Sequence, residues 1–214
     1  MNNKESKVFK LQGWLAILIV LAILVIDQII KICVKTNMTL GESIHITDWF
    51  YINFIENNGM AYGMTFFNKL VLSLFRMVAI FFIGCFIYKV VKRKARIGYV
   101  VCLSMVLAGA AGNLIDCMFY GLLFEASTPF SVADIVPFGS GYSSFLYGKV
   151  VDMFYFPIIQ THWPEWVPYW GGDDFVFFSP IFNFADACIS VGVFFLIVFY
   201  RSELEHIGDV WNGK

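Results

Sequence analysis

Charged residues are scarce in this chain. Only 14% of the 214 residues are Asp, Glu, Lys or Arg, whereas 59% are hydrophobic, and the mean hydropathy is +0.71. Soluble domains carry about 25% charged residues. The composition therefore excludes an ordinary soluble domain and predicts that a lipid bilayer is part of the solvent. The formal net charge of -1 offers no excess of basic residues, so we expect no nucleic-acid partner.

Motifs for metal binding and for nucleophilic catalysis are also missing. The sequence holds three histidines, none in an HExxH spacing, and it contains no GxSxG elbow. No cysteine forms a CxxC pair. We therefore expect no metal and no other cofactor. We also expect five free cysteines that pack as small buried hydrophobic residues, namely Cys33, Cys85, Cys102, Cys117 and Cys188.

Long apolar runs are what the sequence has in abundance. Four of them approach the length of about 20 residues that a membrane-spanning helix needs: 14–34, 70–91, 97–118 and 184–200. This pattern predicts an all-α membrane protein with four transmembrane helices, forming a single integral membrane domain over 1–214. The external segments would be 35–69 and 119–183. We expect the first to hold a small β-sheet, and the second to be a long external loop.

The distribution of basic residues predicts the orientation. Lysines precede the first apolar run, and the segment 92–96 between the second and third runs is Lys-Arg-Lys-Ala-Arg. The segment 119–183 has one basic residue, Lys149, and six acidic ones. Because cytoplasmic loops are enriched in Lys and Arg, both termini should be cytoplasmic and both external segments periplasmic.

Polar residues occur at the outer ends of the apolar runs, where ionisable groups are unfavourable. They form pairs three or four residues apart, so each pair shares one helix face. The pairs are Asp27 with Lys31, Asn113 with Asp116, and Asn183 with Asp186, while Asp152 stands alone in an apolar run of the long loop.

Two interpretations of these polar residues remain open. In the structural one, Asp27 pairs with Lys31 while the others cap helices or form hydrogen bonds between helices. In the functional one, the residues converge, and two carboxylates share a proton to supply an acid and a base together.

Five motifs, in the same order along the chain, resemble those of the bacterial lipoprotein signal peptidases, also called signal peptidase II. They are Val-Ile-Asp-Gln-Ile-Ile-Lys at 25–31, Glu-Asn-Asn-Gly-Met-Ala-Tyr-Gly at 56–63, Gly-Ala-Ala-Gly-Asn-Leu-Ile-Asp at 109–116, Val-Val-Asp at 150–152 and Pro-Ile-Phe-Asn-Phe-Ala-Asp at 180–186.

The resemblance implies a membrane-embedded aspartic endopeptidase. Its catalytic dyad would be Asp152 and Asp186, and the helix N-terminus around Asp186 favours that member as the ionised one. Residues that bind substrate or support the dyad would be Asp27, Lys31, Asn57, Gly59, Asn113, Asp116, Asn183 and Ala185.

The same resemblance implies the substrate and the setting. Substrates would be prolipoproteins whose cysteine carries diacylglycerol, cut on the N-terminal side of that cysteine. The enzyme would work as a monomer among membrane lipids in the bacterial cytoplasmic membrane, with its active site towards the periplasm.

Three departures from the family pattern stand out. Cys117 occupies the place of an arginine that usually follows Asp116, so any anchoring contact from that arginine is absent or made by another residue. Met153 replaces a phenylalanine, and the segments on either side of Asp152 are long. Ala133-Asp134 imitates the last motif, but no apolar run follows it, so we assign it to the insertion.

Two other classes of protein are the alternatives. A small proton- or cation-coupled transporter would use Asp27, Asp116 and Asp186 as intramembrane carboxylates, but no internal repeat is visible. A noncatalytic membrane scaffold would leave the polar motifs unexplained.

Overall fold

Long apolar helices form the body of the molecule. The computed structural model describes residues 3–58 and 69–212. The long helices are α1 (Asn3–Lys35), α2 (Lys69–Lys92) and α3 (Ile97–Ile115), the last continued by the π-helical turn η2 (Asp116–Tyr120) and by α4 (Gly121–Leu123). Three stretches among the described residues, Lys7–Lys35, Lys69–Lys92 and Ile97–Leu123, are long and apolar enough to cross a membrane. A fourth apolar helix, α5 (Phe184–Phe199), is shorter.

The outer faces of these helices are apolar. Leu18 of α1, Phe75 of α2 and Phe194 of α5 are 60%, 68% and 59% exposed. Soluble monomers rarely expose large apolar patches. Side chains of this kind along three helices are what a lipid-facing surface requires, in agreement with the composition.

Small residues allow the helices to approach closely. Helix α3 packs against α1, α2 and α5. A Cβ atom added at Gly109 would lie 2.3 Å from the backbone oxygen of Ala185. Glycine is therefore required at 109, and the N-terminal turn of α5 is brought directly against α3.

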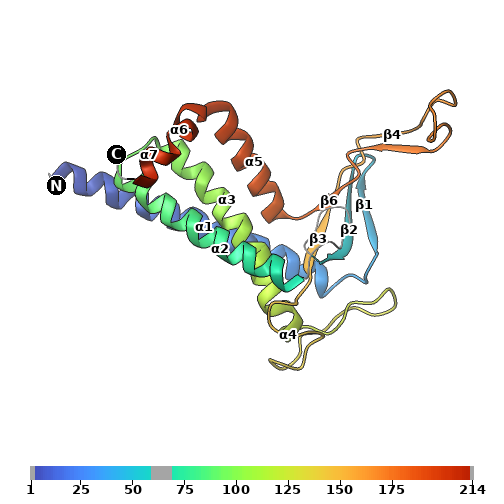
Figure 1. The fold of residues 1–214 in the computed structure, drawn as a ribbon. Helices are drawn as coiled ribbons and strands as arrows, with labels where there is room; N and C mark the ends of the chain where they lie inside the picture. The colour runs from blue at the N-terminus through green and yellow to red at the C-terminus, as the bar shows by residue number, and fades with distance from the viewer. Residues whose placement is uncertain (1–2, 59–68, 213–214) are drawn as a thin grey trace.

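A four-stranded antiparallel sheet covers one end of the helices. Its order is β1-β2-β3-β6, with β1 (Ser43–Thr47), β2 (Phe50–Asn57), β3 (Val150–Tyr155) and β6 (Ile181–Phe182). A separate hairpin is formed by β4 (Ile159–His162) and β5 (Asp174–Phe177). Figure 1 shows both chain termini at the end of the helices opposite to the sheet.

The sheet is larger than the sequence predicted. The expected strands between 35 and 69 are present as β1 and β2, but β3 and β6 come from the segment predicted as a long loop. Asp152 therefore lies in a strand. The run Val150–Tyr155 is β-branched and aromatic, but its partner β2 lies far away in the chain, so the pairing was not visible in the local pattern.

A buried apolar cluster joins the sheet to the helices. Phe54, Val151 and Met153 are fully buried there and pack with Val34 and Tyr120. The methionine that replaces the usual phenylalanine thus serves as a core residue. This packing fixes β2 and β3 on the ends of α1 and η2.

The cysteine prediction was partly wrong. All five cysteines are free, and Cys102, Cys117 and Cys188 are buried, but Cys33 is exposed and Cys85 is half-buried. Helix α1 buries one face only, and Cys33 lies on its other face, which the apolar pattern alone did not distinguish.

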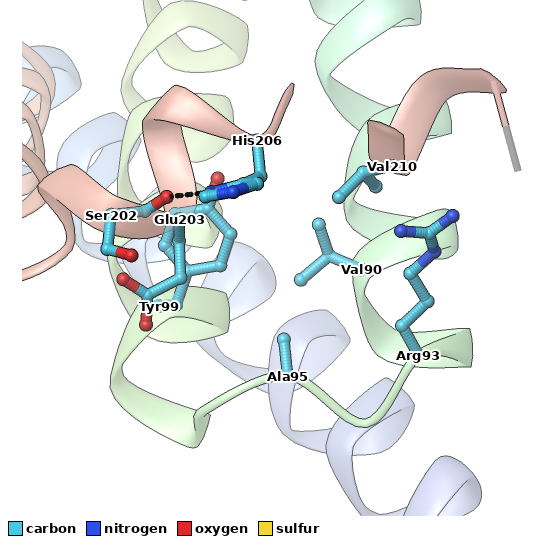
Figure 2. Close-up of a pocket in the computed structure, with 8 residues that line it drawn as sticks. All are labelled: Val90, Arg93, Ala95, Tyr99, Ser202, Glu203, His206 and Val210. Atoms are coloured by element: carbon cyan, nitrogen blue, oxygen red, sulfur yellow. Dashed lines mark hydrogen bonds between the residues drawn. The ribbon is translucent and has the colours of Figure 1, made fainter. Parts of the chain in front are cut away.

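A cavity of about 230 Å³ lies between the long helices and the C-terminal segment (Figure 2). Figure 1 shows that segment at the end of the helices opposite to the sheet. Its walls include Val90 and Tyr99 of the long helices and Glu203, His206 and Val210 of the C-terminal segment. That segment forms α6 (Arg201–Glu205) and α7 (Ile207–Asn212). The carboxylates of the family motifs are not among the residues that line this cavity.

Candidate active site

Asp152 is placed by the register of β2 and β3. Ile55 lies opposite Asp152 and Asn57 lies opposite Val150, so Asn57 and Asp152 are diagonal neighbours on one face of the sheet. Asn57 Nδ2 donates a hydrogen bond to Asp152 Oδ2 over 3.1 Å. The aspartate is 2% exposed, which leaves its carboxyl group to be satisfied by protein partners.

Asp186 is placed by the N-terminus of α5. Asn183 is the N-cap residue, and its Oδ1 accepts a hydrogen bond from the backbone nitrogen of Asp186 over 2.8 Å. Asn113 of α3 donates from Nδ2 to Asp186 Oδ1 over 2.7 Å. Asp186 thus lies in the first turn of α5, where a helix interacts favourably with negative charge.

One buried asparagine joins the two aspartates. Besides capping α5, Asn183 donates from Nδ2 to Asp152 Oδ1 over 2.6 Å and to Asn113 Oδ1 over 3.1 Å. Its side chain is fully buried. Asp152 and Asp186 therefore belong to one network of hydrogen bonds through the amides of Asn183 and Asn113.

The environment of Asp152 favours its protonated form. Burial, and next the negative charge of Asp186, raise the pKa of Asp152 to about 7. Hydrogen bonds from Asn57 and Asn183 and the charge of Lys31 oppose this rise. At neutral pH, Asp152 can therefore hold a proton.

Lys31 organises the polar residues behind the aspartates. Its Nζ lies 2.9 Å from Asp27 Oδ2, 2.8 Å from Asp116 Oδ2 and 2.9 Å from Asn113 Oδ1. The side chains of Lys31, Asp27 and Asp116 are 0% exposed. Because Lys31 has only donors, it must face the oxygen of Asn113. The amide nitrogen of Asn113 is then directed to Asp186.

The two carboxylates beside Lys31 tie other elements into the site. Asp27 Oδ1 accepts from the backbone nitrogen of Ala185 over 2.9 Å, at the start of α5. Asp116 accepts from Gln28 Nε2 over 2.9 Å and from the backbone nitrogen of Val151 over 3.4 Å. Asp27 therefore pairs with Lys31 and Asn183 caps the turn of Asp186, as the structural interpretation predicted, while Asn113 and Asp116 each contact Lys31. The polar residues also converge, and the shared proton stays a prediction.

The structure gathers nearly all the residues that the sequence singled out. One connected set of contacts contains Asp27, Lys31, Asn57, Asn113, Asp116, Asp152, Asn183, Ala185 and Asp186. Gly59 lies outside the described residues.

Sequence reasoning missed part of the network. Gln28 joins Asp116 to Tyr120, whose hydroxyl donates to Gln28 Oε1 over 3.1 Å. A second cluster contains Lys35, Glu56 and Lys149. Two signals could have led to it: Lys35 lies four residues after Lys31 on the same helix face, and Lys149 is the single basic residue of its long segment.

An arginine from another helix lies near Cys117, the residue that replaces the usual arginine of the family. The side chain of Arg76, from α2, donates from Nη1 to Cys117 Sγ over 3.4 Å. A guanidinium group from another helix thus lies beside position 117.

Comparisons with known proteins agree with the motifs. The model of the family described as signal peptidase (SPase) II matches residues 19–201. A lipoprotein signal peptidase of Porphyromonas gingivalis is 48% identical over 199 residues, which cover 92% of this chain and 88% of that protein. One of Amoebophilus asiaticus is 34% identical over 207 residues, covering 94% of this chain and 81% of that protein.

A solved structure shows the same fold. It is a bacterial membrane enzyme determined by the in meso method, and it superposes with a TM-score of 0.57 over 86% of this chain and 90% of its own. The identity is 23%, so this likeness concerns the fold alone.

The family match spans residues 19–201, a range that contains the positions of all five motifs. It decides against the transporter and the scaffold, since neither accounts for this family match. The aspartates and asparagines of these motifs gather around Lys31 at the sheet end of the apolar helices. The chain belongs to the signal peptidase II family of membrane aspartic proteases.

Proposed function

We propose that this protein removes signal peptides from prolipoproteins whose cysteine carries diacylglycerol, and that it cuts on the N-terminal side of that cysteine. The observation that carries the proposal is the network in which Asn183 bonds to Asp152 and caps the helix turn of Asp186. Two carboxyl groups with different surroundings are thereby held in one site, as acid and base catalysis requires.

In the proposed reaction, Asp186 is the base and Asp152 the acid. Asp186 takes a proton from a water molecule, whose oxygen attacks the scissile carbonyl carbon, while Asp152 gives its proton to the carbonyl oxygen. When the C–N bond breaks, the proton held by Asp186 goes to the leaving amine, and Asp152 takes back a proton from one hydroxyl group of the tetrahedral intermediate. The carboxylic acid product forms, and both aspartates return to their starting states. No covalent bond to the enzyme forms at any step.

Asn57 and Asn113 are placed to orient the two carboxyl groups of the proposed dyad. Each donates its amide hydrogen to one of the two catalytic carboxyl groups. A substrate-binding role for these residues and for Gly59 stays a prediction from the family resemblance.

We also propose four spans with both termini in the cytoplasm and the sheet on the periplasmic side, with the enzyme working as a monomer. Helix α5 has 16 residues, a rise of about 24 Å, so it would be a short fourth span. Supporting this orientation, the basic run 92–96 begins at the last residue of α2 and continues through the turn to α3. A reporter that is active only in the cytoplasm, fused to the C-terminus, tests the orientation.

The direct test of substrate is a cleavage assay in detergent. The purified protein is expected to cut a synthetic lipobox peptide whose cysteine carries diacylglycerol, and mass spectrometry should locate the cut before that cysteine. The same peptide without the lipid is the matched control and should remain largely intact. Equal cleavage of both peptides, or a cut elsewhere, contradicts the proposed specificity.

The pH dependence of cleavage follows from Asp152. Burial and the charge of Asp186 raise its pKa to about 7, so the proton is present below that pH and lost above it. We expect kcat to fall about tenfold per pH unit on the alkaline side. The apparent value will belong to the pair of aspartates, because interacting carboxyl groups titrate together.

The variant Asn57→Leu should shift the alkaline limb of the pH–rate profile in a known direction. The substitution removes an N–H group that stabilises the ionised form of Asp152, so the alkaline limb should move to higher pH. A limb that moves to lower pH in this variant, or a wild-type rate that stays constant well above pH 7, would show that Asp152 is not the group that titrates.

A further inference from the structure

A second buried charge cluster lies beside the proposed dyad and involves none of its residues. The carboxylate of Glu56 contacts Lys35 Nζ through Oε1 at 2.5 Å and Lys149 Nζ through Oε2 at 3.1 Å. Ser127 Oγ accepts from Lys35 over 2.8 Å and donates to Glu56 over 2.8 Å. The side chains of Lys35 and Glu56 are 0% and 2% exposed, and that of Lys149, at the edge of the cluster, is 37% exposed.

Stability alone does not account for such a cluster. The loss of hydration of buried charges offsets much of their attraction, and apolar side chains of similar size often serve as well. Burial alone would raise the pKa of Glu56, but Lys35, Ser127 and Lys149 outweigh it and hold that pKa below its ordinary value. Glu56 is therefore charged. Because a buried charge must keep its partners, Glu56 restricts the positions of the chain segments that carry Lys35 and Lys149.

The geometry that this cluster defines is the pairing of β2 with β3. Glu56 directly precedes Asn57 in β2, and Lys149 directly precedes β3. Glu56 lies opposite Val151 in the ladder, and the register is irregular between Ile52 and Ile55. The end of the ladder that carries Asp152 is therefore separated from the rest by a bulge.

A slip at this end would remove Asn57 from Asp152. Side chains alternate between the two faces of a strand, so a shift of one residue turns each side chain to the opposite face. Glu56 and Asn57 point to opposite faces. The contact of Glu56 with Lys149 thus holds the register from the face opposite to the carboxyl group of Asp152.

The inserted segment after α4 encloses this cluster. Tyr142 accepts a hydrogen bond at its hydroxyl from the backbone nitrogen of Lys149 over 2.6 Å. Lys35 Nζ lies 5.1 Å from the centre of the Tyr142 ring and 5.4 Å from that of Phe124, and Lys149 Nζ lies 5.7 Å from Tyr142. Aromatic faces stabilise cations at these distances, so the insertion completes the surroundings of both lysines.

We propose that Glu56, held between Lys35 and Lys149, is a positioning residue that fixes the register of β2 and β3 so that Asn57 faces Asp152. The inserted segment takes part through Ser127 and Tyr142. This inference rests on the proposed catalytic role of Asp152.

The main test compares Glu56→Gln with Glu125→Gln, a matched change at an exposed glutamate of the insertion. We expect Glu56→Gln to lower kcat roughly tenfold to a hundredfold, with little change in KM, because the dyad is misplaced while substrate still binds. Its alkaline limb should move to higher pH, as for Asn57→Leu, because the N–H group of Asn57 no longer supports the ionised Asp152. Glu125→Gln should behave as the wild type.

A double variant tests whether Glu56 acts through Asn57. Adding Glu56→Gln to Asn57→Leu should move the alkaline limb no further than Asn57→Leu alone. Lys149→Met keeps the contact of Glu56 with Lys35, so we expect this variant to fold. It should shift the alkaline limb as Glu56→Gln does. Lys149→Arg, which keeps the positive charge, should show the wild-type pH profile.

The outcomes separate this inference from the proposed function. If Glu56→Gln and Lys149→Met keep the wild-type kcat and pH profile, or lose activity only in step with thermal stability and with an unchanged profile, the positioning role is wrong. If Asp152→Asn still cleaves substrate normally, the proposed function fails instead.

Discussion

Cleavage of the lipidated peptide is expected to fall about a thousandfold or more when either Asp152 or Asp186 is replaced by asparagine. The asparagine side chain is nearly the same size, but it neither accepts the water proton nor donates one of its own as an acid. Each variant thus removes one of the two proton transfers while the amide can still occupy the site. The measurement is the single-turnover rate in detergent, together with the thermal unfolding temperature of each variant.

Asp134→Asn is the matched control. Asp134 also follows an alanine, in Ala133-Asp134, but it is exposed and lies in the inserted segment. This variant should cleave at the wild-type rate. Near-normal cleavage by folded Asp152→Asn or Asp186→Asn would exclude the dyad.

Lys31→Met is expected to cause the largest loss of stability of any single change at the site. It removes the cation between Asp27 and Asp116 and leaves two fully buried carboxylates without it. Breaking a buried ion pair on one side costs about 3–5 kcal/mol, since a charge is left without its partner. The free energy of unfolding, measured by denaturant titration in detergent, should fall by about that amount, and cleavage should be lost with it.

A double variant distinguishes lost charge pairing from lost packing. Asp116→Asn combined with Lys31→Met removes one of the two uncompensated carboxylates. The double variant should therefore lose less free energy of unfolding than the two single variants lose in sum. If the losses simply add, the electrostatic explanation of Lys31 is wrong.

The apolar helices and the proposed catalytic residues could be predicted from the sequence, for different reasons. A spanning helix is a local property, and runs such as 70–91 have both the length and the apolarity that define it; the structure has α2 at Lys69–Lys92. Asp152 and Asp186 were found because each lies in a short motif of the family. Helical spacing alone also placed Asp27 with Lys31 and Asn183 with Asp186.

What the sequence did not show depends on contacts between distant residues. The strand around Asp152 exists because it pairs with β2, nearly a hundred residues earlier, and no local pattern gives that register. The cluster of Lys35, Glu56 and Lys149 likewise joins three separate segments. The π-helical turn Asp116–Tyr120 lies where Gly148 approaches, since a Cβ at Gly148 would be 2.2 Å from the backbone oxygen of Asp116.

The proposed mechanism requires one proton on the Asp152–Asp186 pair at neutral pH, chiefly on Asp152. Infrared difference spectroscopy during a pH titration measures this directly, because a protonated carboxyl group has a C=O band that a carboxylate lacks. The wild type should show such a band at pH 6 that disappears as the pH rises through about 7, and Asp152→Asn should lack it. A titration with no acid band in this range, or a band that Asp152→Asn leaves unchanged, would contradict the proposed mechanism.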